Sequence, residues 1–355
     1  MTPLARRIAS LIEASGPMPV SDYMALCLLD PEHGYYTRRD PIGAAGDFTT
    51  APEVSQMFGE LVAVWLAHGW RAMGAPPDAI VVEIGPGRGT LMADMARTLA
   101  RLAAPLAARL HMVEASPRLA DAQRRRLRDA GHRATWHDAI DALPDAPMLV
   151  VANELFDALP ARQFVAAEGR WRERCVVVRD GALAFGMGAG TLPDPVAPGA
   201  ADGTIREVAP AREALMEALA TRLAARDGLL LAIDYGHWGG PTALGDTLQA
   251  VRAHAYVDPL AEPGLADLTT HVDFGALAAS ARAVGAHIVG RATQGQFLLG
   301  MGLLERAGAL GADMDEDGRD ELRAAVERLA GPDAMGDLFK VLAVSGRARS
   351  LPPFG

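Results

Sequence analysis

Short apolar runs alternate with amphipathic stretches along most of this chain. The apolar runs predict strands near residues 79–84, 110–114, 148–152, 229–233, 286–289 and 339–345. Stretches with the helical spacing of apolar residues predict helices near residues 89–101, 117–130, 210–226, 273–284, 295–307 and 317–330. This alternation is typical of a mainly parallel sheet covered by helices, so the pattern predicts an α/β fold.

Residues 1 to about 75 have a different pattern, which is mostly helical. A polar stretch containing glycine, from Asp30 to Thr50, interrupts these helices. Thr50 and Glu53 have the spacing of a capping box, which predicts that a helix begins after Thr50. We therefore expect an N-terminal helical region over residues 1–75, followed by a core over residues 76–355.

Two long segments interrupt the order of strands and helices in the core. Residues 163–205 contain short β-like pieces and a stretch rich in glycine and proline, and residues 236–270 are irregular. Loops of this length inside a compact domain are usually functional or are insertions. We expect both segments to be insertions that form a subdomain on the substrate side.

The composition excludes several classes of function. A formal net charge of −10 over 355 residues argues against a general nucleic-acid binder, although an acidic surface would attract a basic protein. Cys27 and Cys175 lie far apart, and there is no C-x-x-C motif or histidine cluster, so we expect free thiols and no metal. The start of the chain lacks a secretory apolar segment, and no apolar run reaches the roughly 18 residues of a membrane span. We therefore expect a cytoplasmic protein.

The most informative motif follows the first predicted strand of the core. It reads E-x-G-x-G-x-G, with Glu83 followed by Gly85, Gly87 and Gly89. Glycines let the backbone turn sharply from a strand into a helix and approach a nucleotide cofactor closely. The dinucleotide fingerprint requires glycine or alanine at the position of Thr90. The spacing therefore favours S-adenosylmethionine over a nicotinamide cofactor, and it disfavours an oxidoreductase.

Carboxylates follow the next two predicted strands. Glu114 can accept hydrogen bonds from both ribose hydroxyls, and Asp138 can accept one from the adenine amino group. In an open α/β sheet, ligands bind outside the carboxyl ends of the strands. Glu83, Glu114 and Asp138 therefore predict a cofactor site at one edge of the sheet.

The segment Asn153–Pro160 follows the strand near 148–152 and contains the candidate acceptor residues. Asn153 offers an amide, and Glu154 and Asp157 offer carboxylates that could orient a methyl acceptor or take its proton. A guanidinium acceptor would need such acids more than a hydroxyl or an amine would. Asn153 and Asp157 could instead cap the turn into the next helix.

Segments spread along nearly the whole chain resemble the MidA family of methyltransferases, whose mitochondrial members are complex I assembly factors. The matching segments are Asp30–Tyr36, Gly46–Ser55, Glu83–Gly87, Asn153–Pro160, Asp234–Gly236, Asp267–Phe274 and Phe339–Leu342. The resemblance implies a Rossmann-like class I methyltransferase core with a mainly parallel, seven-stranded sheet. For the mitochondrial members, it implies symmetric dimethylation of an arginine on the 49-kDa-type subunit of complex I.

The resemblance also implies roles for individual residues. Its cofactor set comprises Gly85, Gly87, Glu114, Asp138 and Asn153, to which the motif adds Glu83 and Gly89. The loop from Gly46 to Glu53 would close over S-adenosylmethionine, and over the product S-adenosylhomocysteine. This loop makes Thr49 and Thr50 candidate cofactor ligands and makes Asp47 a candidate catalytic residue beside Glu154 and Asp157.

Two other functions remain open at this level. The protein could methylate a small hydroxylated or amine metabolite, or it could be a cofactor-binding assembly chaperone whose catalysis is dispensable. The sequence does not determine the oligomeric state, and a homodimer is one of the options.

Overall fold

The computed structural model describes residues 1–38, 49–196, 199–240 and 244–354, which form two compact units. The first unit comprises Met1–Phe48, Asp157–Ala214 and His237–Gly275. The second comprises Thr49–Phe156, Leu215–Gly236 and Ala276–Gly355. Both segments that we interpreted as insertions lie mainly in the first unit, so that unit is assembled from stretches far apart in the sequence.

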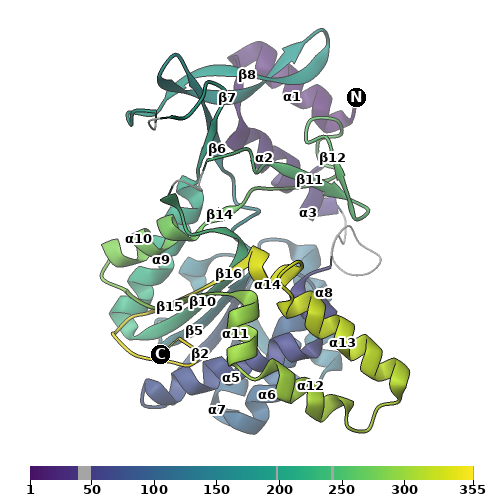
Figure 1. Cartoon of the computed structure of the whole chain (residues 1–355), viewed down its shortest axis with the longest axis vertical. Coiled ribbons are helices and arrows are strands. Elements are labelled where there is room, and N and C mark those ends of the chain that lie inside the picture. Colours follow the sequence, from purple (N-terminus) through teal and green to yellow (C-terminus); the bar gives the residue numbers. More distant parts are fainter. Residues whose placement is uncertain (39–48, 197–198, 241–243, 355) are drawn as a thin grey trace. The chain divides into compact units, whose positions relative to one another are not determined.

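The second unit is built on a sheet with the strand order β15-β16-β10-β5-β2-β3-β4 (Figure 1). The four neighbouring pairs from β10 to β4 are parallel, whereas β16 is antiparallel to both of its neighbours. This arrangement confirms the predicted Rossmann-like sheet. Its strands are β2 (Ile80–Ile84), β3 (Leu110–Val113), β4 (Ala134–His137), β5 (Met148–Asn153), β10 (Gly228–His237), β15 (His287–Thr293) and β16 (Phe339–Ser345).

The central strands form where the sequence predicts them because they are apolar on both faces. Every residue of β2 and β5 is buried, which is typical of a parallel sheet covered by helices on both sides. Val81 and Val151 belong to a large core cluster that also includes Trp65 and Phe58 of a covering helix. Full burial stabilises each such side chain by about 1.5–3 kcal/mol.

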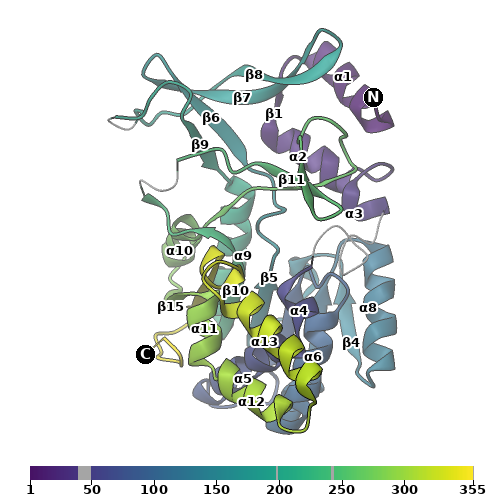
Figure 2. The ribbon, with the colours of Figure 1, turned by 45° about the vertical axis from the view of Figure 1, so that its right-hand side comes forward.

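The helices around this sheet agree largely with the predicted pattern. α8 runs alongside β4 in Figure 2, and α12 and α13 form a helical hairpin. The helix predicted near residues 295–307 is in fact two helices, separated at Met301 and Gly302. The longer helices are α5 (Gln56–Ala72), α6 (Thr90–Leu102), α8 (Pro117–Asp129), α9 (Pro210–Arg226), α10 (Phe274–Ala283), α11 (Gln294–Gly300), α12 (Leu303–Gly311) and α13 (Glu316–Ala330), and the short ones are α4 (Ala51–Val54), α7 (Ala104–Ala107), α14 (Met335–Leu338) and a 3-10 turn at Ile140–Ala142.

The predicted start of a helix after Thr50 is confirmed, but the described residues lack the side-chain hydrogen bonds of a capping box. Thr50 is the N-cap of the single-turn helix α4, but its side chain makes no capping hydrogen bond. The Glu53 carboxylate instead accepts a hydrogen bond from the hydroxyl of Thr90, at the start of α6. The long helix α5 begins one residue after Ser55, whose hydroxyl accepts from the backbone N–H of Met57 at 3.2 Å. Glu53 therefore bonds to Thr90 of α6 and not to the backbone of Thr50, as a capping box would require.

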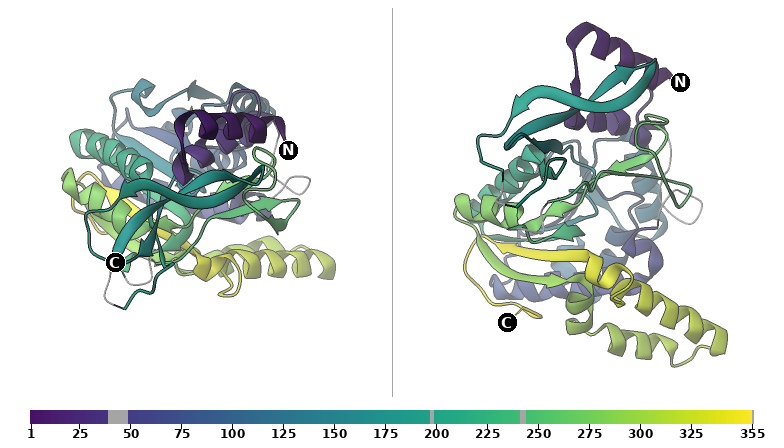
Figure 3. Two further views of the ribbon diagram at one scale, coloured as in Figure 1. Left: turned by 90° about the horizontal axis from the view of Figure 1, so that it is seen from above. Right: turned by 45° about the horizontal axis from the view of Figure 1, so that its top comes forward.

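The first unit combines helices with two antiparallel sheets. β7 lies between β6 and β8 in the larger sheet, and α1 packs beside it (Figure 3). Of these strands, only parts of β6 and β7 were predicted, because β8 is interrupted by glycines. The elements are α1 (Pro3–Ser15), α2 (Val20–Leu29), α3 (Tyr35–Arg38), β1 (Met18–Pro19), β6 (Arg162–Ala167), β7 (Arg170–Arg179), β8 (Ala182–Thr191), β9 (Ile205–Val208), β11 (Gln249–Arg252), β12 (Ala255–Val257), β13 (Asp267–Thr269) and β14 (Val272–Asp273).

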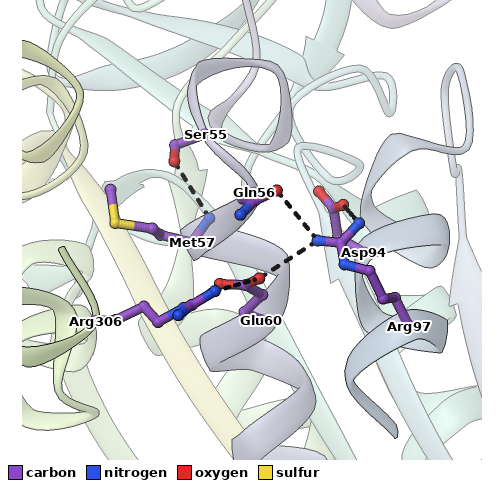
Figure 4. Close-up of polar contacts among 7 residues, drawn as sticks. All are labelled: Ser55, Gln56, Met57, Glu60, Asp94, Arg97 and Arg306. Atoms are coloured by element: carbon purple, nitrogen blue, oxygen red, sulfur yellow. Dashed lines mark hydrogen bonds and ion pairs between the residues drawn. The ribbon is translucent and has the colours of Figure 1, made fainter. Parts of the chain in front are cut away.

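A buried carboxylate connects three helices of the second unit (Figure 4). Glu60 of α5 accepts two hydrogen bonds from Arg306 of α12, at 2.7 and 3.0 Å, and one from Arg97 of α6 at 3.4 Å. Arg97 also pairs with Asp94 at 2.8 Å and donates to Gln56 at 3.5 Å. Glu60 is only 8% exposed, so its charge depends on both arginines for compensation.

We predict that Glu60→Gln lowers the free energy of unfolding by about 1–3 kcal/mol, because it removes the charge from a bidentate, mostly buried pair. The measurement is urea unfolding monitored by circular dichroism. The matched control is Asp121→Asn, which breaks the exposed pair with Arg124 on α8 and should cost at most about 1 kcal/mol. Equal losses in the two variants would contradict a structural role for the network.

Candidate functional site

The glycine motif forms the turn from β2 into α6 and lies at the carboxyl edge of the sheet. Gly85, Gly87 and Gly89 have φ angles of +65°, +52° and +78°, in the left-handed region that favours glycine. The N–H of Gly85 donates to the carbonyl of Val113 at 3.1 Å, and the N–H of Gly89 donates to Pro86 at 2.7 Å. The turn therefore has three positions without side chains, each with a conformation that other residues rarely adopt; Gly85 and Gly87 are half-buried and Gly89 is buried.

Glu83 lies inside the sheet just before this turn and is only 3% exposed. Burial raises the pKa of its carboxyl well above the usual range; the backbone N–H of Met92 opposes this shift, and Glu114 adds to it. Among the described residues, its Oε2 atom has no hydrogen-bond partner. A buried acceptor without a partner is costly, and a hydrogen-bond donor on a ligand would remove that cost.

Glu114 follows β3 and is held in place by its neighbours. One carboxylate oxygen accepts from the N–H of Ser116 at 2.8 Å, and the other accepts from the amide of Gln123 at 2.9 Å. Burial raises the pKa of the Glu114 carboxyl, and these two hydrogen bonds oppose the shift. The carboxylate is thus fixed in orientation at the edge where we expect ribose to bind.

Gln123 is a site residue that the sequence reasoning missed. Its amide donates to Glu114 and, at 2.8 Å, to the carbonyl of Gly87, and its oxygen accepts from the indole of Trp136 at 3.0 Å. Gln123 is fully buried on α8, where Leu119 and other apolar residues form the buried face. A polar residue at helical spacing within an apolar stripe was the available signal.

Asp138 follows β4 directly and is exposed. The residue before it, His137, forms a hydrogen bond of 2.8 Å between its Nε2 and Nδ1 of His111, and the two rings are stacked. Burial, together with the neighbouring His137 and Arg109, lowers the pKa of His111 from 6.5 to about 4. Asp138 therefore extends from a strand end that is fixed by a histidine pair.

Asn153 and Glu154 follow β5 on the same edge of the sheet. Asn153 is 8% exposed; its amide nitrogen donates to Glu154 at 3.2 Å, and its Oδ1 has no partner among the described residues. Glu154 has a φ of +49°, a strained conformation for this residue type, and its Oε1 accepts from the N–H of Ala51 at 3.1 Å. The acid is thereby placed between the end of β5 and the start of α4.

Thr49 and Thr50, which precede Ala51, are both half-buried, so Glu154 adjoins the segment predicted to cover the cofactor. The Thr50 carbonyl accepts from the N–H groups of Glu53 and Val54, at 2.9 and 3.3 Å. Asp47, the third predicted catalytic residue, lies outside the described residues.

Asp157 belongs to the first unit and is 7% exposed. Its carboxylate accepts from the N–H of Ala158 at 2.8 Å, a contact within the turn, but the turn leads into the strand β6 and not into the helix that we expected. The buried Arg212 donates to the carbonyls of Asp157, Leu159 and His271, at 2.9, 3.0 and 2.7 Å. Sequence reasoning missed Arg212, which fixes this loop of the first unit.

Asp234, at 0% exposure in β10, is another residue that the sequence reasoning did not select. Its two oxygens accept from the N–H groups of Phe156 and Tyr235, each at 2.9 Å. Asp234 thereby holds the loop that follows Asn153 and Glu154 in a defined path.

The residues of the second unit fit S-adenosylmethionine. Gly85 and Gly87 place no side chain at the turn, Glu114 presents a fixed carboxylate, and the amide oxygen of Asn153 has no partner among the described residues. We propose that these four residues, with Glu83, Gly89, Asp138, Thr49 and Thr50, bind the cofactor.

We predict that Gly85→Ala weakens binding of S-adenosylhomocysteine at least tenfold in calorimetric titration. A Cβ at this position would lie 2.8 Å from Cδ1 of Leu155 and would strain the φ of +65°, so the turn would have to shift. Gly74→Ala is the matched control, because its φ is +87° and nothing lies within 4 Å of the added atom. Unchanged affinity in the Gly85 variant would remove this turn from the cofactor site.

We also predict that His111 makes the fold sensitive to acid. The pKa of His111 is about 4 in the folded protein, and its ordinary value is 6.5. Between pH 4 and pH 6.5, His111 is therefore protonated in the unfolded chain but mostly neutral in the folded one. Stability from this group is full above pH 6.5 and falls as the pH drops toward 4. Urea unfolding across this range should show a smaller decline for His111→Asn. His254→Asn, at an exposed turn with φ +61°, should leave the decline unchanged, and equal declines in both variants would disprove the assignment.

Comparisons with known proteins identify the family and the cofactor. Residues 61–292 match a family described as "Putative S-adenosyl-L-methionine-dependent methyltransferase". The protein arginine methyltransferase NDUFAF7 homolog, mitochondrial, of Drosophila melanogaster is 37% identical over 372 residues, covering 96% of this chain and 84% of its own. The Homo sapiens protein arginine methyltransferase NDUFAF7, mitochondrial, is 32% identical, covering 97% and 83%. A crystal structure from Burkholderia thailandensis, bound to S-adenosyl-homocysteine, has a TM-score of 0.85 and 32% identity, covering 98% and 93%.

The cytoplasmic location predicted from the sequence is contradicted by these relatives. The Drosophila, zebrafish (Danio rerio) and human proteins are all named as mitochondrial. The prediction failed because it rested on missing features, and the lack of a secretory segment does not choose among the remaining compartments. Separately, no helix in the described part of the chain is long and apolar enough to cross a membrane.

The glycine turn, the fixed carboxylate at the strand edge and the full-length similarity lead to one assignment. The alternative of a nicotinamide enzyme is excluded. The chain belongs to the MidA/NDUFAF7 family and is a class I methyltransferase that uses S-adenosylmethionine.

Proposed function

We propose that this enzyme methylates an arginine side chain of a protein and that its substrate is a respiratory complex I subunit, which it dimethylates symmetrically. The names of the relatives, protein arginine methyltransferases, support the arginine substrate. The observation that carries the proposal is the position of Glu154, whose carboxylate follows β5 at the cofactor edge and contacts Ala51.

A guanidinium is a demanding acceptor. It is positively charged at all physiological pH values, so it attracts carboxylates and must lose a proton when it is methylated. A carboxylate held near the reacting nitrogen can orient the planar group and accept that proton. An amine or a hydroxyl metabolite would not require a strained acid at this place.

The proposed mechanism gives each group of residues one task. S-adenosylmethionine, when bound, supplies a methyl group on a sulfonium sulfur and leaves as the thioether S-adenosylhomocysteine. The glycine turn, Glu114 and Asn153 hold the cofactor. Glu154 aligns an arginine nitrogen for in-line attack, so that an N–C bond forms as the S–C bond breaks, and it takes the proton released from that nitrogen.

The strain at Glu154 is consistent with this role. A φ of +49° is uncommon outside glycine, asparagine and aspartate, and such conformations persist only when the surroundings enforce them. Here the N–H of Glu154 donates to the Ile233 carbonyl at 2.9 Å. The Glu154 carboxylate accepts hydrogen bonds from the N–H of Ala51 and from the side-chain amide of Asn153. The side chain is thus held in one direction before any acceptor arrives.

Asp157 and Asp47 remain candidates for the same task. Asp157 is supported by its burial and by the fixed loop around it, although its contact with Ala158 is also that of a turn cap.

We predict that Glu154→Gln lowers methyl transfer to the complex I subunit homologue at least about 100-fold. The change keeps an acceptor oxygen for Ala51 but removes the base, so affinity for S-adenosylhomocysteine should stay within about threefold. The measurement is mass spectrometry of the methylated subunit, with fragmentation that separates symmetric from asymmetric dimethylarginine. The control is Glu217→Gln, at an exposed position of α9.

Full activity in the Glu154 variant would remove this residue from the mechanism and leave Asp157 and Asp47. Methylation of small molecules in a cell extract, without methylation of any protein, would instead favour a metabolite as the acceptor. Unimpaired complex I assembly by a variant that binds no cofactor would favour the chaperone.

A further inference from the structure

The strand β8 is the outer edge of the larger sheet in the first unit (Figures 1 and 3). Within the described chain, β8 pairs only with β7, in an antiparallel register from Arg179↔Ala182 to Arg172↔Thr191. Edge strands present unpaired N–H and C=O groups and invite pairing with another chain. The free edge of β8 is therefore a candidate site for pairing with a strand of another chain.

The usual protections of an edge strand are mostly missing from β8. Its ten residues contain no charged residue and no proline. The one irregularity is the register shift beside Arg172 and Arg174, which affects the last residues of the strand, from Gly188 onward. The first six residues, from Ala182 to Met187, form a regular ladder with β7 and leave a regular free edge.

The turn between β7 and β8 determines which backbone groups face outward. Asp180 and Gly181 form a two-residue turn with φ angles of +52° and +76°, which is closed by the pair Arg179↔Ala182. The closing pair of such a hairpin exchanges both hydrogen bonds, and hydrogen-bonded pairs then alternate along the ladder. The N–H and C=O groups of Leu183, Phe185 and Met187 are therefore directed to the open edge.

These three residues also place their side chains on one face, because side chains alternate along a strand. Leu183 and Phe185 pack partly against the core of the first unit, and Met187 is 54% exposed. The guanidinium of Arg174 lies 3.6 Å from the centre of the Phe185 ring and pairs with Asp246 at 2.7 Å. The ring is thus held in place before any partner binds.

We propose that the free edge of β8 is a self-association surface, at which two copies of the chain pair β8 with β8 in antiparallel orientation. A two-fold axis at Phe185 would place Phe185 opposite its counterpart and Leu183 opposite Met187 of the second copy. All three outward residues are then hydrogen-bonded pairs, which gives about six backbone hydrogen bonds across the axis. Apolar side chains meet apolar side chains, and no charge is brought into the strand pair.

Charge does not select a different partner. Arg172 and Arg179 on β7 are exposed and form no ion pair among the described residues. Arg179 pairs with Ala182 and Arg172 with Thr191, so both lie outside the stretch from Leu183 to Met187, and Arg174, within that stretch, already pairs with Asp246. An acidic peptide would therefore gain little along this stretch. A second copy would bring the same uncharged, apolar edge, so two copies match without an unpaired charge.

The test is sedimentation equilibrium of the full chain over a wide range of concentrations. A single pair of edge strands is a small interface, so we expect a monomer–dimer equilibrium in the micromolar range. Met187→Lys should weaken dimerisation at least tenfold, because a charge would be buried opposite Leu183 of the second copy and because lysine is a natural guard of edge strands. Met187→Glu, which would bury a charge of the opposite sign at the same place, serves as a second variant if the first fails to fold. Leu304→Lys, which changes another exposed apolar residue to lysine on α12, should leave the equilibrium unchanged.

The register is tested separately with a spin label on Met187→Cys, because Cys27 and Cys175 are buried. Pairing about Phe185 places the two Cα atoms of residue 187 about 14 Å apart, from four residues at about 3.4 Å each and one strand spacing. A wild-type chain that stays monomeric at all concentrations would overturn the proposal. So would a dimer that Met187→Lys and Met187→Glu do not weaken, or labels more than about 25 Å apart.

Discussion

Parallel pairing of β2, β3, β4, β5 and β10 is the constraint on which the rest of the site depends. The N–H groups of Gly85, Glu114 and Glu154 donate to the carbonyls of Val113, His137 and Ile233, the last residues of the neighbouring strands in the pairing registers. Each residue that follows a strand is therefore still tied to the sheet. Because parallel strands all end at the same edge, this single hydrogen-bonding pattern gathers residues from distant parts of the sequence along one line. The sheet therefore fixes the positions of Gly85, Glu114 and Glu154, three residues of the proposed site.

The same edge is where the molecule departs from ordinary stability rules. Glu83 and Asn153 are buried and each keeps an acceptor oxygen without a partner among the described residues, and Glu154 has a positive φ. Such departures cost about 1–3 kcal/mol each and persist only where the surroundings enforce them. Elsewhere in the second unit, a buried charge such as Glu60 is fully compensated by arginines. Glu60, on a helix, has charged partners and is a structural polar group. The acceptors of Glu83 and Asn153, at the strand ends, have none among the described residues, and these are the groups that we propose meet a ligand.

Sequence reasoning succeeded where a local pattern determines structure and failed where tertiary contacts do. The strands β2 and β5 were predictable because a continuous apolar run can only be a buried strand in this context. Gln123 and Asp234 were not selected, since they act on groups that are distant in the sequence; for Gln123, its helical spacing within an apolar stripe was the one local signal. Thr50 had the spacing of a capping box, yet Glu53 bonds to Thr90 of another helix instead. β8 was missed because its glycines hide the alternation of a strand. At Gly188 the glycine is needed for packing, since a Cβ added there would lie 2.5 Å from the sulfur of Cys175.

The first unit shows how interrupted segments become one folded body. Arg212 is 2% exposed, and its guanidinium donates to backbone carbonyls of residues 157–159 and 270–271. A buried guanidinium is tolerated only when its donors are satisfied, and here that requires both segments to be in place at once. The loop that carries Asp157 therefore cannot adopt its path independently of the segment near Thr270. The loop at residues 157–159 and the end of the irregular segment near residue 270 are in this way coupled by one side chain, so the position of Asp157 depends on more than its own turn.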